Sequence, residues 1–138
     1  MAPESDTNEQ VVVQVEGRSV TISLPPPGAR PDRPSVFFVG LPKAGSTLLY
    51  RIARPLAGGA GLTWFGPQPE LHAAGLFPSD YPAEVNALYR PTGYAYGGYR
   101  SIPGALTIPS YAAGRTVVLV RDPRDMLTSL YYSVAISH

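Results

Sequence analysis

The chain has 138 residues, enough for one domain with a buried core. A content of 44% hydrophobic and 15% charged residues is that of a globular protein rather than a disordered one. The net charge of +1 gives no electrostatic argument for nucleic acid or a membrane surface, and the lack of cysteine excludes disulfides and thiol chemistry. The sequence shows no signal region and no run of transmembrane length, so we expect a cytoplasmic protein.

Alternating apolar residues near the N-terminus predict a β-hairpin. The alternation runs on both sides of a turn at Gly17, through Val11, Val13 and Val15 and then Val20, Ile22 and Leu24. Five prolines between positions 25 and 34 then predict an extended linker. We therefore interpret residues 1–34 as an N-terminal extension with a hairpin, and residues 35–138 as the main domain.

The next unit is a strand, a tight loop and a helix. The apolar run 36–39 is typical of a parallel strand that is buried on both faces. Gly40 ends the strand, Ser46 and Thr47 open a helix after the loop, and Pro55 is expected to stop that helix. Backbone N–H groups converge where such a loop meets a helix, and the helix dipole favours a negative group there. We therefore expect an anion site.

The single lysine of the chain, Lys43, lies in this loop, whereas arginine occurs ten times. An arginine-rich composition is one explanation; the other is that a compact ammonium suits a terminal oxyanion. The loop differs from the standard nucleotide-triphosphate pattern, in which lysine follows the second glycine directly. It resembles the phosphosulfate loop of sulfotransferases, P-K-x-G-[ST]-T, at every fixed position of 42–47. The resemblance implies that the phosphosulfate is bound by Lys43, Ala44, Gly45, Ser46 and Thr47.

The middle of the chain has weaker signals. We predict a short strand over 62–65, irregular structure over 66–80, and a short helix over 83–88 that Ser79 or Asp80 caps and Pro82 opens. A further strand is predicted around Tyr94, Tyr96 and Tyr99, with glycines that let another group approach the backbone. These tyrosines either line a pocket for a carbohydrate or aromatic acceptor or are ordinary strand residues. Residues 104–114 are rich in turn formers.

A second strand and helix end the chain. The run 117–120 predicts a buried strand, and Asp122, Pro123 and Asp125 suit the N-cap and first turn of a helix. The apolar stripe of this helix consists of Met126, Leu127, Leu130, Tyr131 and Val134. Arg121 stands at the carboxyl end of the strand, where open parallel sheets bind ligands, and Ser129 lies about two helical turns further on.

The pattern R-[DN]-P-x-D-x-x-x-S after a strand resembles the second sulfotransferase motif, and residues 121–129 match it. Taken alone, the pattern also fits a helix start with a surface arginine. The resemblance covers about 35–138 and implies that Arg121 and Ser129 hold the 3′-phosphate of 3′-phosphoadenosine 5′-phosphosulfate (PAPS). It implies an α/β fold with a P-loop-like parallel sheet flanked by helices. Strands 36–39 and 117–120 are then neighbours or near neighbours, with Lys43 and Arg121 at one edge.

The sequence offers two candidates for the general base. Many cytosolic sulfotransferases carry a catalytic histidine in a K-[ST]-H-x-P segment, but Ser101 stands at that place here. Other sulfotransferases resemble a second arrangement, in which a glutamate that follows the phosphate loop takes the place of the histidine. Glu70 is the candidate for this glutamate, and His72 is the second choice for the base. Both residues also fit an ordinary solvated loop.

The resemblance implies an enzyme that moves a sulfuryl group from PAPS to an acceptor hydroxyl or amine, with 3′-phosphoadenosine 5′-phosphate (PAP) as product and without a metal. A non-catalytic nucleotide-binding remnant and, less favoured, a P-loop kinase or NTPase are the alternatives. Family domains are about twice as long, so we interpret the chain as the N-terminal portion, with a sheet incomplete at its C-terminal side. Strand 117–120, or its helix, should then be exposed, which makes the chain marginally stable, oligomeric or aggregation-prone, and inactive alone.

Overall fold

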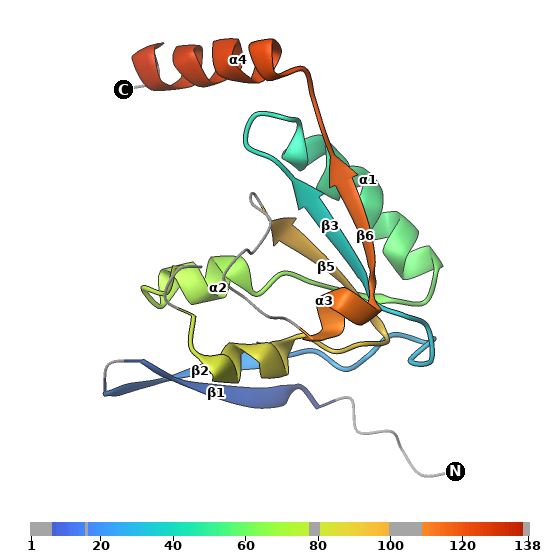
Figure 1. Cartoon of the computed structure of the whole chain (residues 1–138). Helices are drawn as coiled ribbons and strands as arrows, with labels where there is room; N and C mark the ends of the chain where they lie inside the picture. The colour runs from blue at the N-terminus through green and yellow to red at the C-terminus, as the bar shows by residue number, and fades with distance from the viewer. Residues whose placement is uncertain (1–6, 16, 78–80, 100–108, 137–138) are drawn as a thin grey trace.

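The computed structural model describes residues 7–15, 17–77, 81–99 and 109–136, which form an α/β fold. Four parallel strands make the central sheet in the order β4-β5-β3-β6 (Figure 1). They are β3 (Val36–Gly40), β4 (Thr63–Phe65), β5 (Tyr94–Tyr99) and β6 (Arg115–Leu119). The antiparallel pair β1 (Glu9–Val15) and β2 (Arg18–Leu24) forms a separate hairpin, which confirms the prediction for the N-terminus.

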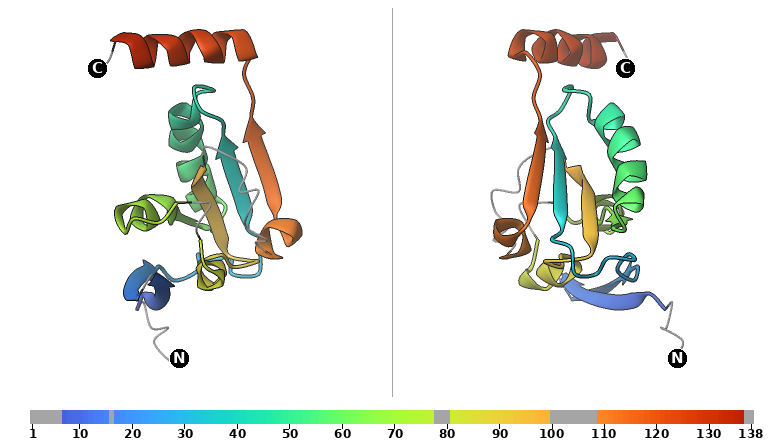
Figure 2. Two further views of the ribbon diagram at one scale, coloured as in Figure 1. Left: turned by 60° about the vertical axis from the view of Figure 1, so that its left-hand side comes forward. Right: turned by 90° about the vertical axis from the view of Figure 1, so that its right-hand side faces the viewer.

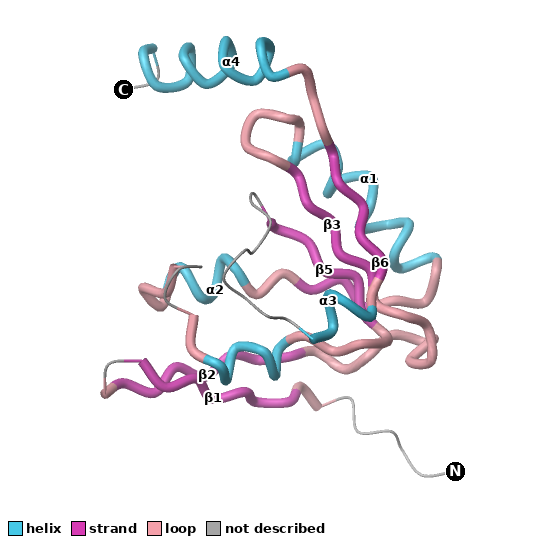
Figure 3. Tube along the Cα trace, viewed as in Figure 1, coloured by secondary structure: helices cyan, strands magenta, loops and turns pink. Residues whose placement is uncertain are grey.

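Helices and a 3-10 turn connect and flank the strands. They are α1 (Ser46–Gly59), α2 (Gln68–Ala73), the 3-10 helix η2 (Ala83–Leu88), α3 (Pro109–Ala113) and α4 (Pro123–Ile136). Figure 2 shows α1 and α3 on opposite sides of the sheet, with the hairpin beyond its amino-terminal end. Helix α4 follows β6 through a short connection and stands apart from the sheet (Figure 3).

Strand β3 is the centre of the fold because it pairs with β5 on one side and with β6 on the other. Its side chains alternate between two clusters. Phe37 and Val39 are fully buried in the main core, whereas Val36 and Phe38 pack on the side of Ala57 in α1. This arrangement confirms the prediction that strands 36–39 and 117–120 are parallel neighbours, although β6 starts and ends slightly earlier than expected.

The main core is aromatic and includes the hairpin. Phe37 stacks on Tyr96 with ring centroids 4.9 Å apart, and Tyr111 of α3 meets Phe37 edge-on. Residues of the hairpin, β3, β4, α2, η2 and β5 share this cluster, among them Val13, Ile22, Leu24, Phe65, Leu71 and Leu88. The prediction that glycines in this strand let another group approach the backbone is confirmed at Gly97 of β5. The Trp64 ring lies where a Cβ of Gly97 would be.

Three predictions about helices were wrong. Helix α1 continues past Pro55 to Gly59, since proline removes one backbone hydrogen bond while Ala53 and Ala57 on the inner face keep the helix on the sheet. Residues 68–73 form α2 rather than irregular structure, because a proline in the first turn removes an N–H that has no helical partner anyway. Pro82 is the N-cap of η2, without a side-chain cap, while Ser79 and Asp80 lie outside the described residues.

The last strand and helix are exposed. Strand β6 has β3 as its neighbour on one side, and Val117 and Val118 are each 42% exposed, so the prediction of a buried strand was wrong. Helix α4 has no buried residue, and its predicted apolar stripe is open to solvent at Leu127, Leu130, Tyr131 and Val134. The exposure expected for this strand or its helix is therefore confirmed for both.

Two core tyrosines offer a matched test of buried hydrogen bonding. The Tyr96 hydroxyl accepts from Arg90 N at 2.6 Å and donates to Leu88 O at 3.1 Å, whereas the buried Tyr99 hydroxyl makes no well-formed hydrogen bond to any residue that the structure describes. Because an unsatisfied buried polar group costs stability, Tyr99→Phe should be neutral or stabilising by up to about 1–2 kcal/mol. Tyr96→Phe should destabilise by about 1–3 kcal/mol, since it leaves a buried carbonyl unpaired. Urea unfolding measures both, and a larger loss for Tyr99→Phe would contradict the packing described here.

Candidate anion site at the carboxyl ends of β3 and β6

The loop after β3 is shaped by two backbone constraints. A Cβ on Gly40 would lie 2.6 Å from Cβ of Ser46, so only glycine lets the start of α1 come this close to the end of β3. Gly45, the N-cap of α1, has a φ of 98°, and Lys43 has a φ of 61°, the only positive value at a described non-glycine residue. A left-handed lysine costs roughly 1 kcal/mol, and strain of this kind is concentrated at functional sites.

The N-terminus of α1 opens onto this loop without a side-chain cap. Gly45 provides no capping oxygen, and the first turn contains no acidic residue. The N–H groups of the first turn are therefore not bonded by a cap, and the helix dipole adds positive potential where they point. Such an end attracts phosphate or sulfate.

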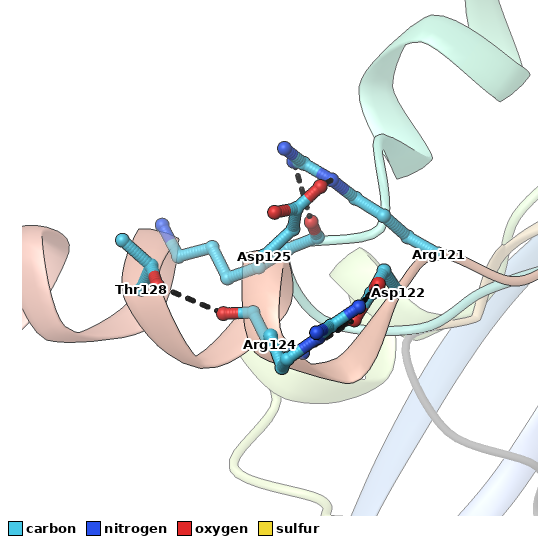
Figure 4. Close-up of polar contacts among 6 residues, drawn as sticks. Arg121, Asp122, Arg124, Asp125 and Thr128 are labelled. Atoms are coloured by element: carbon cyan, nitrogen blue, oxygen red, sulfur yellow. Dashed lines mark hydrogen bonds and ion pairs between the residues drawn. The ribbon is translucent and has the colours of Figure 1, made fainter.

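The end of β6 brings a second cation to the same edge. Arg121 donates from Nη1 to the backbone oxygen of Lys43 at 3.3 Å, and its Nε lies 3.6 Å from Asp125 Oδ2 (Figure 4). This contact confirms the prediction that Lys43 and Arg121 lie at one edge of the sheet. Because the ion pair with Asp125 is exposed, it contributes little to stability and leaves the guanidinium accessible.

Asp122 is engaged in starting α4. Its Oδ1 accepts from Arg124 N at 2.9 Å, which confirms the predicted cap, and its Oδ2 accepts from Arg124 Nη2 at 2.8 Å (Figure 4). The hydrogen bonds from Arg124 lower the pKa of the Asp122 carboxyl. The aspartate therefore remains ionised and orients the first turn of α4, which carries the next site residues.

A pocket of about 560 Å³ lies between the loop and α4. The described residues that line it are Pro42, Lys43, Gly45, Ser46, Thr47, Arg121, Ser129, Leu130 and Ser133. A volume of this size is that of a small-molecule site. The structure therefore brings together all the predicted nucleotide-binding residues except Ala44, which is buried and does not line the described pocket.

Ser133 is a site residue that the motif analysis missed. Its Oγ accepts a 2.6 Å hydrogen bond from Nζ of Lys43. The sequence feature that could have identified Ser133 is its position four residues after Ser129, because this spacing places both hydroxyls on one face of a helix.

The candidate bases lie elsewhere. Glu70 is in the first turn of α2 and His72 in its last turn; both are exposed, and neither is among the described residues that line the pocket. The His72 ring meets Phe77 edge-on. Ser101, at the place of the missing histidine, lies outside the described residues.

The three tyrosines of β5 are core residues. Tyr94, Tyr96 and Tyr99 are all buried and do not line the described pocket, and burial raises the pKa of Tyr99 well above its ordinary value. Of the two explanations offered by the sequence, the structure thus favours strand packing over an acceptor pocket for these side chains.

Comparison of the chain with protein-family models, curated proteins and solved structures finds no match. Among the described helices, none is long and apolar enough to cross a membrane. The described His, Asp and Glu residues also form no group of three that could hold a metal ion. The geometry of the pocket and the two motifs are therefore the grounds for a functional proposal.

The backbone strain at Lys43 can be separated from its charge. Lys43→Gly removes the left-handed penalty and should raise the free energy of unfolding by up to about 1 kcal/mol relative to Lys43→Ala, which keeps the penalty. Both variants should weaken binding of phosphate or sulfate at the loop equally, by about tenfold to a hundredfold, because both remove the ammonium. Thermal unfolding and titration calorimetry provide the two readouts. A Lys43→Ala variant more stable than Lys43→Gly would contradict the assigned backbone conformation.

Proposed function

We propose that the chain binds PAPS and is the nucleotide-binding part of a sulfotransferase, in a sheet of the P-loop-like kind. The observation that carries the proposal is the meeting of Lys43, Arg121 and the N-terminus of α1 in one pocket, at the carboxyl ends of two adjacent parallel strands. Two sequence motifs that are 74 residues apart supply these groups, and each resembles a sulfotransferase motif. Residues of both motifs line the same pocket.

The chemistry of the pocket suits both ends of this nucleotide. Lys43 and the first-turn N–H groups of α1 would hold the 5′-phosphosulfate, and Arg121 with Ser129 would hold the 3′-phosphate. In the transfer, an acceptor oxygen or nitrogen forms a bond to sulfur as the bond from sulfur to the bridging phosphate oxygen breaks. PAP leaves with the electron pair, and a base takes the acceptor proton. Lys43 would stabilise the charge that develops on the leaving phosphate.

A P-loop kinase or NTPase is less well supported. That reaction needs Mg²⁺ held by a loop hydroxyl and by an aspartate at a strand end. Asp122 is the aspartate at the end of β6, but its two carboxylate oxygens cap α4 and pair with Arg124. Magnesium-independent binding of PAP, against magnesium-dependent binding of ATP, separates the two proposals.

A non-catalytic nucleotide-binding protein is the second candidate. The observation in its favour is the position of Glu70 on α2, away from the described residues of the pocket. In either case the pocket binds the same nucleotide, so the two candidates differ in turnover rather than in affinity.

Arg121 should discriminate the 3′-phosphate. Arg121→Ala should weaken PAP binding by about 1.5–3 kcal/mol, the scale of a charge-assisted hydrogen bond. It should leave binding of adenosine 5′-phosphate, which lacks the 3′-phosphate, nearly unchanged. Arg124→Ala is the matched control, because this arginine is exposed and pairs with Asp122 outside the pocket. Equal losses for the two nucleotides, measured by titration calorimetry, would reject this role for Arg121.

Glu70 is the proposed base, and its substitution separates transfer from binding. In a full-length homologous context, Glu70→Gln should abolish sulfuryl transfer to a broad panel of hydroxyl and amine acceptors, and should keep PAP affinity within a few fold because the pocket residues are untouched. Glu84→Gln, at an exposed position in the first turn of η2, is the control. Turnover by the Glu70 variant at the wild-type rate would rule out Glu70 as the base and make His72 the next candidate. In that full-length context, no turnover with Glu70 intact and with PAP still bound would favour the non-catalytic candidate.

A further inference from the structure

Helix α4 turns Ser129 and Ser133 toward the phosphate loop, together with Leu130 from its apolar stripe. Its three half-buried residues are Met126, Ser129 and Ser133, which follow one another at helical spacing and therefore share a face. Ser129 and Ser133 on this face line the pocket. The larger apolar residues of the helix are exposed, with Leu127 and Tyr131 each at 67%.

Because no residue of α4 is buried, apolar packing does not account for its position beside the loop. Two polar contacts connect this part of the chain to the loop. Lys43 Nζ donates to Ser133 Oγ at 2.6 Å, and Arg121, just before the helix, donates to the backbone oxygen of Lys43 at 3.3 Å. Both contacts involve Lys43, so this residue connects the loop to α4.

The bond between Lys43 and Ser133 is compatible with a bound anion. An ammonium group has three N–H donors and Ser133 takes one, which leaves two for oxygens in the pocket. The Ser133 hydroxyl accepts from Lys43 and keeps its own hydrogen to donate. A phosphate or sulfate oxygen beside Lys43 can therefore be contacted from the loop and from α4 together.

We propose that Ser133 is a positioning residue of the anion site: its hydroxyl orients the Lys43 ammonium and thereby couples anion binding to the docking of α4 on the loop. The inference rests on the proposed function for the identity of the ligand, a nucleotide phosphate or sulfate group. It adds a residue outside both motifs and a physical link between the two halves of the pocket. An anion held by Lys43, Ser129 and Ser133 stabilises the docked helix by its binding free energy, because the undocked helix offers no serine contacts.

Hydrogen exchange of the α4 amides, without nucleotide, tests the positioning contact directly. Ser133→Ala and Lys43→Ala should each speed exchange in 124–136 by about 10- to 150-fold, the equivalent of one hydrogen bond to a charged group. The double variant should exchange no faster than either single variant, because both remove the same bond. Ser133→Thr keeps the hydroxyl and should therefore exchange as slowly as the wild-type protein. Thr128→Ala is the matched control on the same helix, since the Thr128 hydroxyl bonds to Arg124 O within α4 and does not line the pocket.

Binding of PAP tests the coupling. PAP should slow exchange of α4 in the wild-type protein, and Ser133→Ala should weaken PAP binding by about 3- to 10-fold. In a Lys43→Ala background the serine substitution should cause no further loss. A role of Ser133 in helix stability alone would give equal losses in both backgrounds.

The outcomes separate this inference from the proposed function. Exchange of α4 that is equal in wild type and Ser133→Ala, or PAP binding that leaves α4 exchange unchanged, would overturn the positioning role while PAP binding itself still supports the function. A wild-type protein that fails to bind PAP would overturn the proposed function and the coupling, and the exchange experiment without nucleotide would still decide the contact between Lys43 and Ser133.

Discussion

The close approach of α1 to the end of β3 is the constraint on which the site depends. Gly40 and Ser46 lie so near each other that a side chain on Gly40 would meet both Cα and Cβ of Ser46. The chain must therefore reverse within five residues, and it does so through positive φ angles at Lys43 and Gly45. The same reversal places the lysine and the first N–H groups of α1 on one side of the loop. Site geometry and backbone strain thus have one origin.

Sheet register then brings the second motif to the loop. In the parallel pairing of β3 with β6, Gly40 is opposite Leu119, so the two strands end together. Arg121, two residues beyond Leu119, consequently lies beside the loop and contacts the Lys43 carbonyl. No covalent or metal link is required, because the register of two strands separated by 74 residues in the sequence is sufficient.

Local patterns made much of this architecture predictable. Three predictions depended only on residues that are close together in the sequence, and all three were confirmed. They concern the strand over 36–39, the β-hairpin and the helix cap at Asp122. Prolines gave wrong predictions at α1 and α2, because the effect of a proline depends on what the rest of the helix packs against. Leu71, fully buried in the main core, stabilises α2 through contacts that no local pattern contains.

Predictability ended where a residue depends on a partner far along the chain. The apolar stripe of α4 indicates which side chains prefer burial, but the described chain places no element over them. The contact of Ser133 with Lys43 joins residues 90 positions apart and belongs to neither motif. Glu70 is the opposite case. The resemblance to sulfotransferases suggested it as the base, but it lies on α2 and is not among the described residues that line the pocket.

The position of the hairpin has a consequence for how the protein is made. Val13, Ile22 and Leu24 are buried against β5 and η2 residues, and the Tyr94 hydroxyl donates to Pro25 O at 2.8 Å. The hairpin is synthesised first, yet the residues that cover its apolar face emerge about 75 positions after Leu24, roughly 4–15 s later at ordinary elongation rates. During that interval the apolar side chains of the hairpin have nothing to pack against, and an isolated two-stranded hairpin is at best marginally stable in water. The hairpin therefore gains its stability only after β5 and η2 have emerged and can pack against it.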